Sequence, residues 1–333
     1  MNSPKRALGA RIRRIPHRLS LMYADQLAAA WARTSPRRDV PMLAEIGATR
    51  PRSQRRIAVV CHVFYTDLIP ELKQLFEHLP PVTDLFLSVT SEAARTVTLE
   101  EFESYALGEV DVRVVENKGR DIAPKYVTFA DVIDGDYELI LYLHTKKSTD
   151  RRMGALWRRH LYDHLLGSDA VVDEILAQFD ADPALGVVAP PHFEPVRRWT
   201  DWSGNFSEAA VLARRMGLSI TRWSPPDFPS GSMFWARPGA LQPINRLGLT
   251  LDEFPEEAAQ VQDTLMHAIE RFVYLAAAAA GYRSATVPPS PAAESSPAPA
   301  LEAATAPVTA VRPSWRMRAG AAREVWRALR ARS

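Results

Sequence analysis

The 333-residue sequence predicts an α/β fold in which helices flank a mostly parallel sheet. Short apolar runs typical of buried strands recur from residue 57 onwards. Amphipathic segments separate these runs, and parallel strands need helical crossovers of this kind between them. Hydrophobic residues make up 47% of the chain, so it can bury a large core.

Strand and helix alternate along the first half of this region. The run IAVVCHV at 57–63 is continuous and apolar, as expected of a strand buried on both faces. Leu68, Leu72 and Leu75 then fall on one face of a helix. Similar patterns predict, in order, a helix over 67–78, a strand over 83–90, a short helix over 102–107, a strand over 110–115, a helix over 123–132 and a strand over 138–143.

The second half continues the alternation and completes a domain over residues 56–284. Its expected elements are a helical region over 156–179, a strand over 185–191, a helix over 206–216, a strand over 231–237 and a long helix over 256–280. Gly281 follows the last of these helices, and glycine is typical of a helix C-terminus.

Both ends of the chain are basic and differ from this domain in composition. Residues 1–55 form an arginine-rich extension with helical apolar spacing over 7–34, which either packs on the core or lies on a membrane surface. Residues 285–311 are rich in Ala and Pro and predict a disordered linker. Residues 312–333 are a basic amphipathic tail, either a helix on an anionic membrane or a solvated, disordered segment.

Charge and cysteine content exclude several classes of protein. The formal net charge is only +2 although both ends are basic, so the middle is acidic and unsuited to nucleic acid. Cys61 is the only cysteine, which rules out an internal disulfide and suits a reducing compartment. The sequence shows neither a secretory signal nor the ~20 apolar residues of a membrane span. We therefore expect a cytoplasmic protein that can associate peripherally with the inner membrane surface.

A polar segment follows the third expected strand and contains Asn117, Gly119, Arg120 and Asp121. Open α/β sheets bind ligands beyond the carboxyl ends of their strands, where this segment begins. Gly119 permits a tight turn, and Arg120 offers a planar fork for a phosphate. Asp121 can accept hydrogen bonds from hydroxyl groups. The alternative interpretation is a glycine turn followed by an aspartate that caps a helix.

A second cationic segment follows the fourth expected strand and should reach the same edge. It contains His144, Lys146 and Lys147. A lysine beside a phosphate oxygen gains roughly 4 kcal/mol at partial exposure, so the segment is a candidate diphosphate site. A solvated basic loop is the alternative.

A divalent metal at this edge would need oxygen ligands. Many sugar-nucleotide enzymes supply them with an Asp-x-Asp pair, which is absent after the fourth strand here. Asp134-Gly135-Asp136 imitates the pair but precedes that strand, so we expect it to be a turn at the opposite edge. We expect the protein's own cations to replace a metal and expect no cofactor, with a divalent metal as the less favoured alternative.

A loop rich in aromatic and polar residues follows the fifth expected strand. Trp199, Trp202 and Asn205 offer the flat faces and hydrogen-bonding groups that suit a sugar. Ser232 lies next to Gly231 at the start of the sixth strand and is expected in the same acceptor-binding region. The alternative is that both tryptophans cap the hydrophobic core.

Asp263 is the candidate catalytic base. In the expected long helix it falls near the border of the apolar face, so it could point into a cleft and take a proton from an acceptor hydroxyl. The alternative is a surface charge that pairs with His267 or Arg271.

Five strings occur in one order over roughly residues 55–285, and together they resemble the rhamnan synthesis protein F family. They are His62-Val63-Phe64-Tyr65, Glu116-Asn117-Lys118-Gly119-Arg120-Asp121-Ile122-Ala123-Pro124, His144-Thr145-Lys146-Lys147-Ser148, Gly231-Ser232-Met233-Phe234-Trp235-Ala236-Arg237-Pro238, and the segment from Asp263-Thr264-Leu265 through His267-Ala268-Ile269-Glu270-Arg271.

The resemblance implies a GT-A-like fold and a role in building rhamnose-containing or other cell-surface polysaccharide. His62 joins the expected nucleotide-sugar-binding residues on this ground. The layout is also similar to that of the inverting glycosyltransferases with this fold. Asn117 and Gly119 match the Asn-x-Gly turn that follows the third strand in that group, and Gln262-Asp263 matches half of its Glu-Asp pair on a late helix. The cationic His144-Thr145-Lys146 departs from that group's acidic motif.

The expected function is transfer of a sugar, with inversion, from a nucleotide-sugar donor to a lipid-linked glycan or cell-surface polysaccharide. The expected donor is dTDP-L-rhamnose. The alternative is a non-catalytic scaffold of a surface-glycan assembly complex that keeps the glycosyltransferase-like fold.

The role of Asp263 can be tested directly. Asp263→Asn should lose turnover and keep nucleotide binding, because the amide cannot accept the acceptor's proton. Full activity in that variant, measured as nucleotide release, would remove Asp263 as the base.

Overall fold

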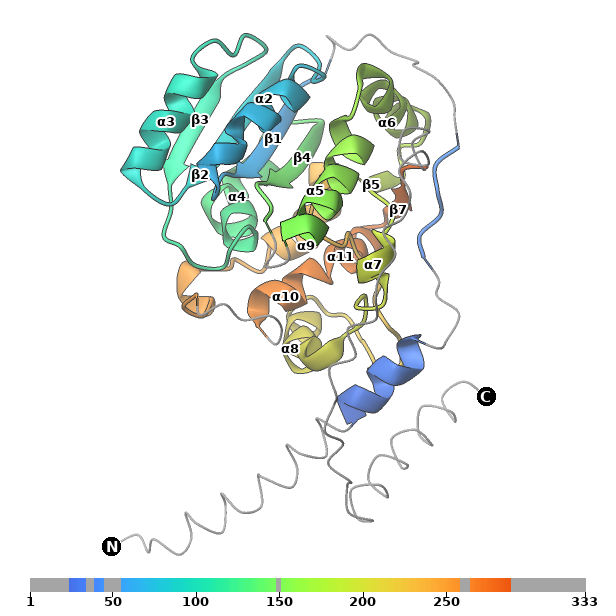
Figure 1. Cartoon of the computed structure of the whole chain (residues 1–333). Helices are drawn as coiled ribbons and strands as arrows, with labels where there is room; N and C mark the ends of the chain where they lie inside the picture. Colours follow the sequence, from blue (N-terminus) through green and yellow to red (C-terminus); the bar gives the residue numbers. More distant parts are fainter. Residues whose placement is uncertain (1–23, 34–38, 45–54, 148–150, 258–263, 289–333) are drawn as a thin grey trace, which may run out of the picture.

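The computed structural model describes residues 24–33, 39–44, 55–147, 151–257 and 264–288 (Figure 1). Its centre is a seven-stranded sheet with the strand order β3-β2-β1-β4-β6-β5-β7. The strands are β1 (Ile57–His62), β2 (Thr83–Val89), β3 (Val110–Val114), β4 (Leu139–His144), β5 (Leu185–Ala189), β6 (Phe234–Ala236) and β7 (Arg283–Thr286). Neighbouring strands are parallel except where β6 pairs with β4 and β5. The predicted fold class, a mostly parallel sheet flanked by helices, is confirmed.

One group of helices covers the first face of the sheet. It comprises α2 (Ile69–Phe76), α3 (Glu92–Phe102), α5 (Arg151–Leu166) and α6 (Asp169–Ala181). Successive strand residues point to opposite faces, so Ile57, Val59 and Cys61 pack into this core. The same core holds leucines of α2 and α5, which confirms the apolar face expected for the helix over 67–78.

A second group covers the opposite face and faces Ala58 and Val60 of β1. It comprises the π-helical segment η3 (Pro124–Thr128), α4 (Ala130–Ile133), α8 (Phe206–Arg215), α9 (Pro238–Asn245), α10 (Leu265–Glu270) and α11 (Val273–Ala279). Short turns complete the described elements, namely η2 (Thr66–Leu68), α7 (Glu194–Arg197), η4 (Ser203–Asn205) and η5 (Leu251–Glu253). The domain thus has three layers, with the sheet in the middle.

Two helices differ from the sequence prediction. The short helix expected over 102–107 lies earlier, as α3, because the Ser91 hydroxyl accepts the Ala94 N–H at 3.1 Å and caps it. The long helix expected over 256–280 is two helices among the described residues, α10 and α11. Arg271, between them, donates to the carbonyl of His267 at 2.7 Å, so a side chain satisfies a carbonyl near the end of α10.

The sheet extends beyond the expected domain boundary at residue 284. Strand β7 runs to Thr286, pairs in parallel with β5, and buries Ala285 completely. The expected linker therefore cannot begin at Ala285. Arg283 is followed by the small residues Ser284, Ala285 and Thr286, so this strand lacks the run of large apolar side chains that marks strands such as β1 and β4.

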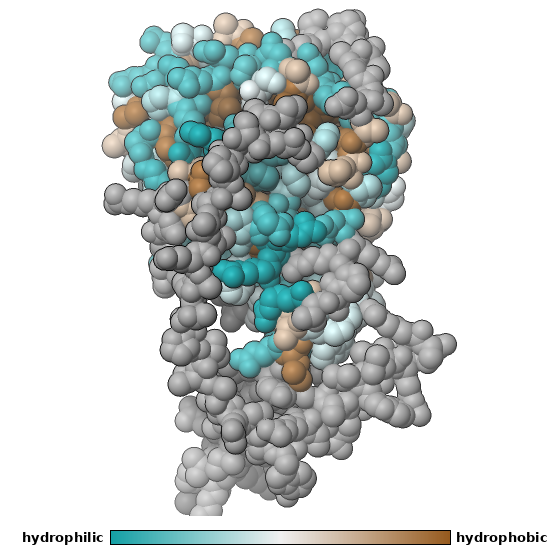
Figure 2. Space-filling view, turned by 45° about the vertical axis from the view of Figure 1, so that its right-hand side comes forward, coloured by the Kyte–Doolittle hydropathy of each residue, from teal (hydrophilic) through white to brown (hydrophobic). Residues whose placement is uncertain are grey.

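The face of the described structure that Figure 2 shows is mostly polar. In the face shown in Figure 2, hydrophilic residues cover most of the coloured area and hydrophobic residues occur in small groups. Exposed large hydrophobic residues such as Met42, Val97 and Trp199 lie in different parts of the chain. Within the described part of the chain, no helix combines the length and the apolar character that spanning a bilayer requires.

The burial of β7 can be tested by an Ala→Asp pair. Ala285→Asp should lower the free energy of unfolding by roughly 2–7 kcal/mol, because it buries a polar group without a hydrogen-bond partner. Ala278→Asp, on the exposed side of α11, is the matched control and should cost much less. Denaturant unfolding measures both, and equal stabilities would show that residue 285 is not part of the core.

Candidate functional site

The carboxyl ends of β1 and β4 bring two buried histidines side by side. His62 and His144 are the last residues of these strands and are register partners, and His62 also pairs with Ser88 of β2. His62 Nδ1 lies 2.9 Å from Ser88 Oγ. Because β6 runs antiparallel, the turn Ser230–Ser232 that precedes it reaches the same edge of the sheet. This is the edge of the sheet at which the sequence predicts a ligand-binding site.

A buried lysine connects the first polar segment to that turn. Lys125 lies in η3, and its side chain is 1% exposed. Its ammonium donates to Asp121 Oδ2 at 2.6 Å, to the Ser232 carbonyl at 2.5 Å and to Ser232 Oγ at 2.8 Å. These three acceptors match the three donors of an ammonium group. Lys125 was not among the predicted site residues, although its spacing of four residues from Asp121 was a signal.

The backbone at this site is strained at two non-glycine residues. Arg120 has φ +52° and Ser232 has φ +59°, next to Gly119 at +72° and Gly231 at +93°. Such conformations cost about 1–3 kcal/mol each in non-glycine residues and are found mainly at functional sites. Ser232 is itself one of these strained residues, and Asp121 directly follows the other, Arg120. Lys125 is hydrogen-bonded to both Asp121 and Ser232.

The charges at this edge are strongly coupled. Burial disfavours the ionised form of Asp121, but Lys125 and His144 outweigh this and hold its pKa well below the ordinary value. The His144 Nδ1 atom lies 3.5 Å from Asp121 Oδ2. Burial lowers the pKa of His62 to about 4 and that of His144 to about 3, so both rings are neutral at pH 7.

The first polar segment is held by two glutamates. Arg120 donates to both carboxylate oxygens of Glu257, from Nε at 3.1 Å and from the terminal nitrogen at 3.0 Å. Lys118 Nζ lies 3.1 Å from Glu256 Oε1, and the backbones of these two residues form an isolated antiparallel β-bridge. The positive charge of Arg120 contributes to lowering the pKa of Lys146, so the two cationic segments share one region.

The two lysines of the second segment have different surroundings. Lys146 is half buried, and its Nζ lies 3.9 Å from the centroid of the Trp157 ring. Burial lowers the pKa of Lys146, against the charges of Glu270 and Asp121. Lys147 instead forms an ion pair with Asp67 and lies over the Tyr65 ring. The structure thus does not bring Lys147 to the other predicted binding residues.

Helix α10 contributes two titratable groups to this edge. Glu270 Oε1 accepts the N–H of Gly231 at 3.3 Å, and burial raises the pKa of Glu270. His267 Nδ1 lies 2.6 Å from Thr264 Oγ1, and burial together with Arg120 lowers its pKa to about 4. From the sequence, His267 is predicted only as a possible ion-pair partner of Asp263, and no role is predicted for Glu270.

We call the group Asp121, Lys125, His144, Lys146, Ser232 and Glu270 the edge cluster. It combines an ionised carboxylate, ammonium groups, a hydroxyl and a carboxyl group with a raised pKa. These are groups that can bind hydroxyls and phosphates and can move a proton. The cluster does not fit a divalent metal, because its carboxylates are flanked by lysines and Asp121 is bonded to Lys125.

Among the described residues, one group could offer a metal ion three ligand atoms that lie within 4.8 Å of one another. Its members are Asp39, His192 and Asp227. Each already has protein partners. His192 contacts Ser230 Oγ at 2.9 Å and Asp227 at 3.0 Å, and Asp39 pairs with Arg197.

The structure corrects part of the predicted acceptor site. Trp202 is only 4% exposed, packs on Phe206 and Phe272, and donates its indole N–H to the Ser224 carbonyl at 2.7 Å. It belongs to the hydrophobic core and cannot line an open groove. Asn205 is also fully buried, whereas Trp199 is 50% exposed. Ser232 belongs to the edge cluster.

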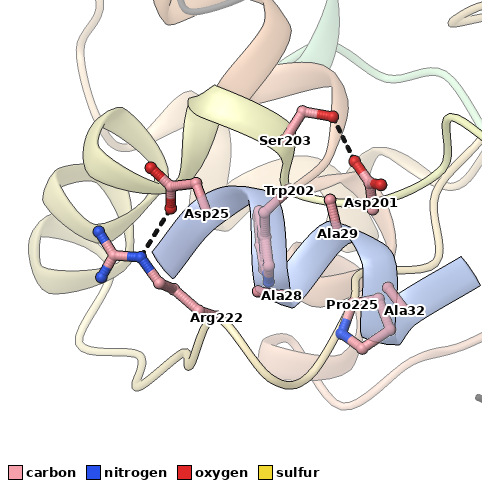
Figure 3. A pocket seen from close by; sticks show the side chains of 9 residues that line it. All are labelled: Asp25, Ala28, Ala29, Ala32, Asp201, Trp202, Ser203, Arg222 and Pro225. Atoms are coloured by element: carbon pink, nitrogen blue, oxygen red, sulfur yellow. Dashed lines mark hydrogen bonds and ion pairs between the residues drawn. The ribbon is translucent and has the colours of Figure 1, made fainter. Parts of the chain in front are cut away.

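Trp202 also packs beneath the N-terminal extension. The helix over residues 24–33 buries Ala24, Ala28 and Ala32, and together with Trp202 it lines a cavity of about 10 Å³ (Figure 3). Asp25 accepts from Arg222 at 2.7 Å. For these described residues, packing on the core, one of the two alternatives expected for the extension, is confirmed. The candidate base Asp263 and its neighbour Gln262 lie outside the described residues.

The fold and the edge cluster define an α/β protein with a polar, cationic site at the carboxyl edge of its sheet. The family model described as "Rhamnan synthesis protein F" matches residues 35–282, and the chain belongs to this family. Two relatives from Xanthomonas campestris pv. campestris, strains B100 and ATCC 33913, are both described as "Uncharacterized protein WxcX". Each is 36% identical over 234 residues, or 69% of this chain. That match covers 32% of each relative, so this chain spans about a third of their length.

Among solved structures, the chain is similar to the mannosyltransferase PcManGT from Pyrobaculum calidifontis, described as a complex with GDP-Man and Mn2+. The TM-score is 0.41 at 14% identity, over 85% of this chain and 66% of the other. This likeness is too low to bear on the function of the chain.

Removal of the buried ammonium should destabilise the protein in a pH-dependent way. Lys125→Met leaves Asp121 buried without its partner and should cost roughly 3–5 kcal/mol at pH 7. In the wild type, the low pKa of Asp121 stabilises the fold above the ordinary aspartate value of 3.8, and this contribution is lost as the pH falls below it. In the variant, protonation of Asp121 relieves the penalty, so the stability gap should shrink on acidification.

Two control variants accompany this measurement by denaturant unfolding. Lys73→Met removes an exposed pair with Glu101 and should change stability by less than about 1 kcal/mol. The double variant Asp121→Leu/Lys125→Met should recover much of the loss, because neither charge is then left unpaired. A Lys125→Met protein as stable as the Lys73→Met control would contradict the buried pair.

Proposed function

We propose that this chain is a glycosyltransferase domain that moves a sugar from a nucleotide-sugar donor to a glycan acceptor. The observation that carries the proposal is the edge cluster, which gathers Asp121, Lys125 and Lys146 where open α/β sheets bind ligands. Family membership supports sugar transfer in polysaccharide synthesis. The family's name favours L-rhamnose from a dTDP donor and a lipid-linked or cell-surface glycan as acceptor.

Within this proposal the cations have separate tasks. Lys125 has all three donors occupied by protein oxygens, so it fixes Asp121 and Ser232 and does not bind the donor. Among the described residues, Lys146 pairs with no carboxylate and lies over an aromatic ring, which leaves its ammonium for a diphosphate. Asn117, Gly119 and Arg120 approach the donor from the other segment.

Asp121 is ionised and is held in place by Lys125, so it suits the hydroxyl groups of the sugar or the ribose. The buried rings of His62 and His144 lie near Asp121, and both are neutral at pH 7. A single in-line displacement would invert the anomeric centre. We further propose that transfer needs no divalent metal, because protein cations face the departing diphosphate.

A scaffold without catalytic activity is the second candidate, and one observation favours it. Arg120 and Lys118 are each paired with a glutamate of this chain, so much of the positive charge of the first polar segment is already neutralised. A catalytic site would need a ligand to compete with these pairs.

The wider setting of the chain is also proposed. The basic segments within 1–23 and 289–333 lie outside the described residues and would attach a cytoplasmic protein to the anionic inner membrane surface. No nucleic-acid partner is proposed, because the excess of basic residues lies at the two ends of the chain.

Nucleotide titration separates the two candidates. The wild type should bind dTDP or UDP, and Lys146→Met should weaken binding about tenfold through loss of a partly buried charge contact, worth about 1.4 kcal/mol. Lys73→Met on α2 should bind as the wild type does. Absence of binding to both nucleotides, with no nucleotide released from a panel of sugar donors, would favour the scaffold.

The same donor assay tests the metal. Release of nucleotide should persist in EDTA. Activity that disappears in EDTA and returns with Mg²⁺ or Mn²⁺ would contradict the metal-independent mechanism.

A further inference from the structure

The edge cluster contains two described carboxyl groups with opposite surroundings. Asp121 is bonded to Lys125 at 2.6 Å and lies 3.5 Å from His144. The Lys125 ammonium stabilises its charge, so it is a poor acceptor for a proton. When neighbouring carboxyl groups differ in this way, the environment itself separates the group that stays ionised from the group that can carry a proton.

Glu270 is the other carboxyl group. It ends α10, and its side chain is 21% exposed, so it is mostly buried and still reachable. Its shortest described contact is the Gly231 N–H at 3.3 Å, and the nearest Arg271 nitrogen lies 3.8 Å away. Glu270 thus lacks the short ion pair that Asp121 has.

The groups that act on Glu270 come from each element around it. Arg271 follows it directly at the end of α10, Asp121 precedes η3, Lys125 lies in η3, and Lys146 follows β4. Burial raises the pKa of Glu270, with Asp121 acting in the same direction and the three cations acting against it. The balance favours a carboxylate that accepts a proton more readily than an ordinary glutamate does.

The contact with Gly231 links Glu270 to the rest of the cluster. Gly231 and Ser232 form the strained turn before β6, and Ser232 is bonded to Lys125. A Cβ at Gly231 would lie 2.8 Å from a Leu161 methyl group, so the turn has little freedom. The carboxylate of Glu270 is therefore positioned by a backbone that the core and Lys125 hold in place.

We propose that Glu270 is the general base of this site, the group that takes the proton from the acceptor hydroxyl. This inference rests on the proposed glycosyltransferase function. It assigns to a described residue the role that the sequence analysis gave to Asp263.

In the proposed step, the acceptor O–H bond breaks and its proton passes to a carboxylate oxygen of Glu270. The acceptor oxygen forms a bond to the anomeric carbon of the donor as the bond from that carbon to the diphosphate breaks. The electron pair of that bond leaves with the nucleoside diphosphate, whose charge Lys146 faces. Glu270 then returns its proton to solvent.

The experiment compares Glu270→Gln, Asp263→Asn and the wild type in single-turnover and steady-state transfer from the best donor of the panel. Glu270→Gln should lose roughly 10²- to 10⁴-fold in kcat, the range for removal of a general base, and should bind dTDP or UDP within about twofold of the wild type. Glu208→Gln, exposed on α8, is the matched control and should keep full activity.

The pH profile supplies a readout that a purely structural role would not move. The base must be ionised, so wild-type kcat should fall as the pH drops through a value above the ordinary glutamate pKa of 4.5. This acid limb should disappear from the residual activity of Glu270→Gln. Glu270→Asp should retain an acid limb, with kcat reduced by the displaced carboxylate.

The outcomes distinguish the two levels of the proposal. A wild type that transfers no sugar and binds neither nucleotide contradicts the proposed function. An active wild type with a Glu270→Gln variant of full kcat contradicts only the assignment of the base. A third outcome would return the role to Asp263. In that case Asp263→Asn would lose kcat and the acid limb of the pH profile, whereas Glu270→Gln would retain a full kcat and the acid limb.

Discussion

The buried ammonium of Lys125 is the interaction on which the candidate site depends. An ammonium group removed from water needs its three donors satisfied, and here one carboxylate and two oxygens of Ser232 satisfy them. The acceptors come from segments more than a hundred residues apart in the chain. The π-helical turn of η3 positions the lysine, and the lysine in turn fixes the orientation of Asp121 and of the turn before β6. The neutral histidines His62 and His144 complete this buried edge.

Much of the fold could be predicted because strands buried on both faces need continuous apolar runs. Strands β1 and β4 are such runs, and both were placed within a residue of their observed ends. Strand β7 was missed, because Ser284 and Ala285 are small residues whose burial depends on neighbours distant in sequence. The break between α10 and α11 was missed for a similar reason. Arg271 reaches the carbonyls of His267 and Asp201, and the second of these contacts is tertiary.

The site was predictable where it followed from the direction of the strands. Parallel strands end at one edge, so the polar residues after β3 and β4 had to approach each other, and Asp121, His144 and Lys146 do so. Side-chain destinations were less predictable. Lys125 was overlooked because a lysine in a helix is usually exposed, and the loop residue Trp202 was assigned to a sugar although it belongs to the core. The role of Asp263 stays a prediction.

Strand β6 has only three residues, yet it is hydrogen-bonded to a neighbour on each side. Its alignment with Tyr142 and Val188 determines which residue of the preceding turn meets the ammonium of Lys125. A slip by a single position would present Gly231 or Met233 in place of Ser232. Glycine offers no side-chain oxygen, and the thioether of methionine is only a weak acceptor. The chemistry available at the site is therefore set by sheet alignment. Changes in the length of the chain before β6 would be tolerated only where they leave that alignment intact.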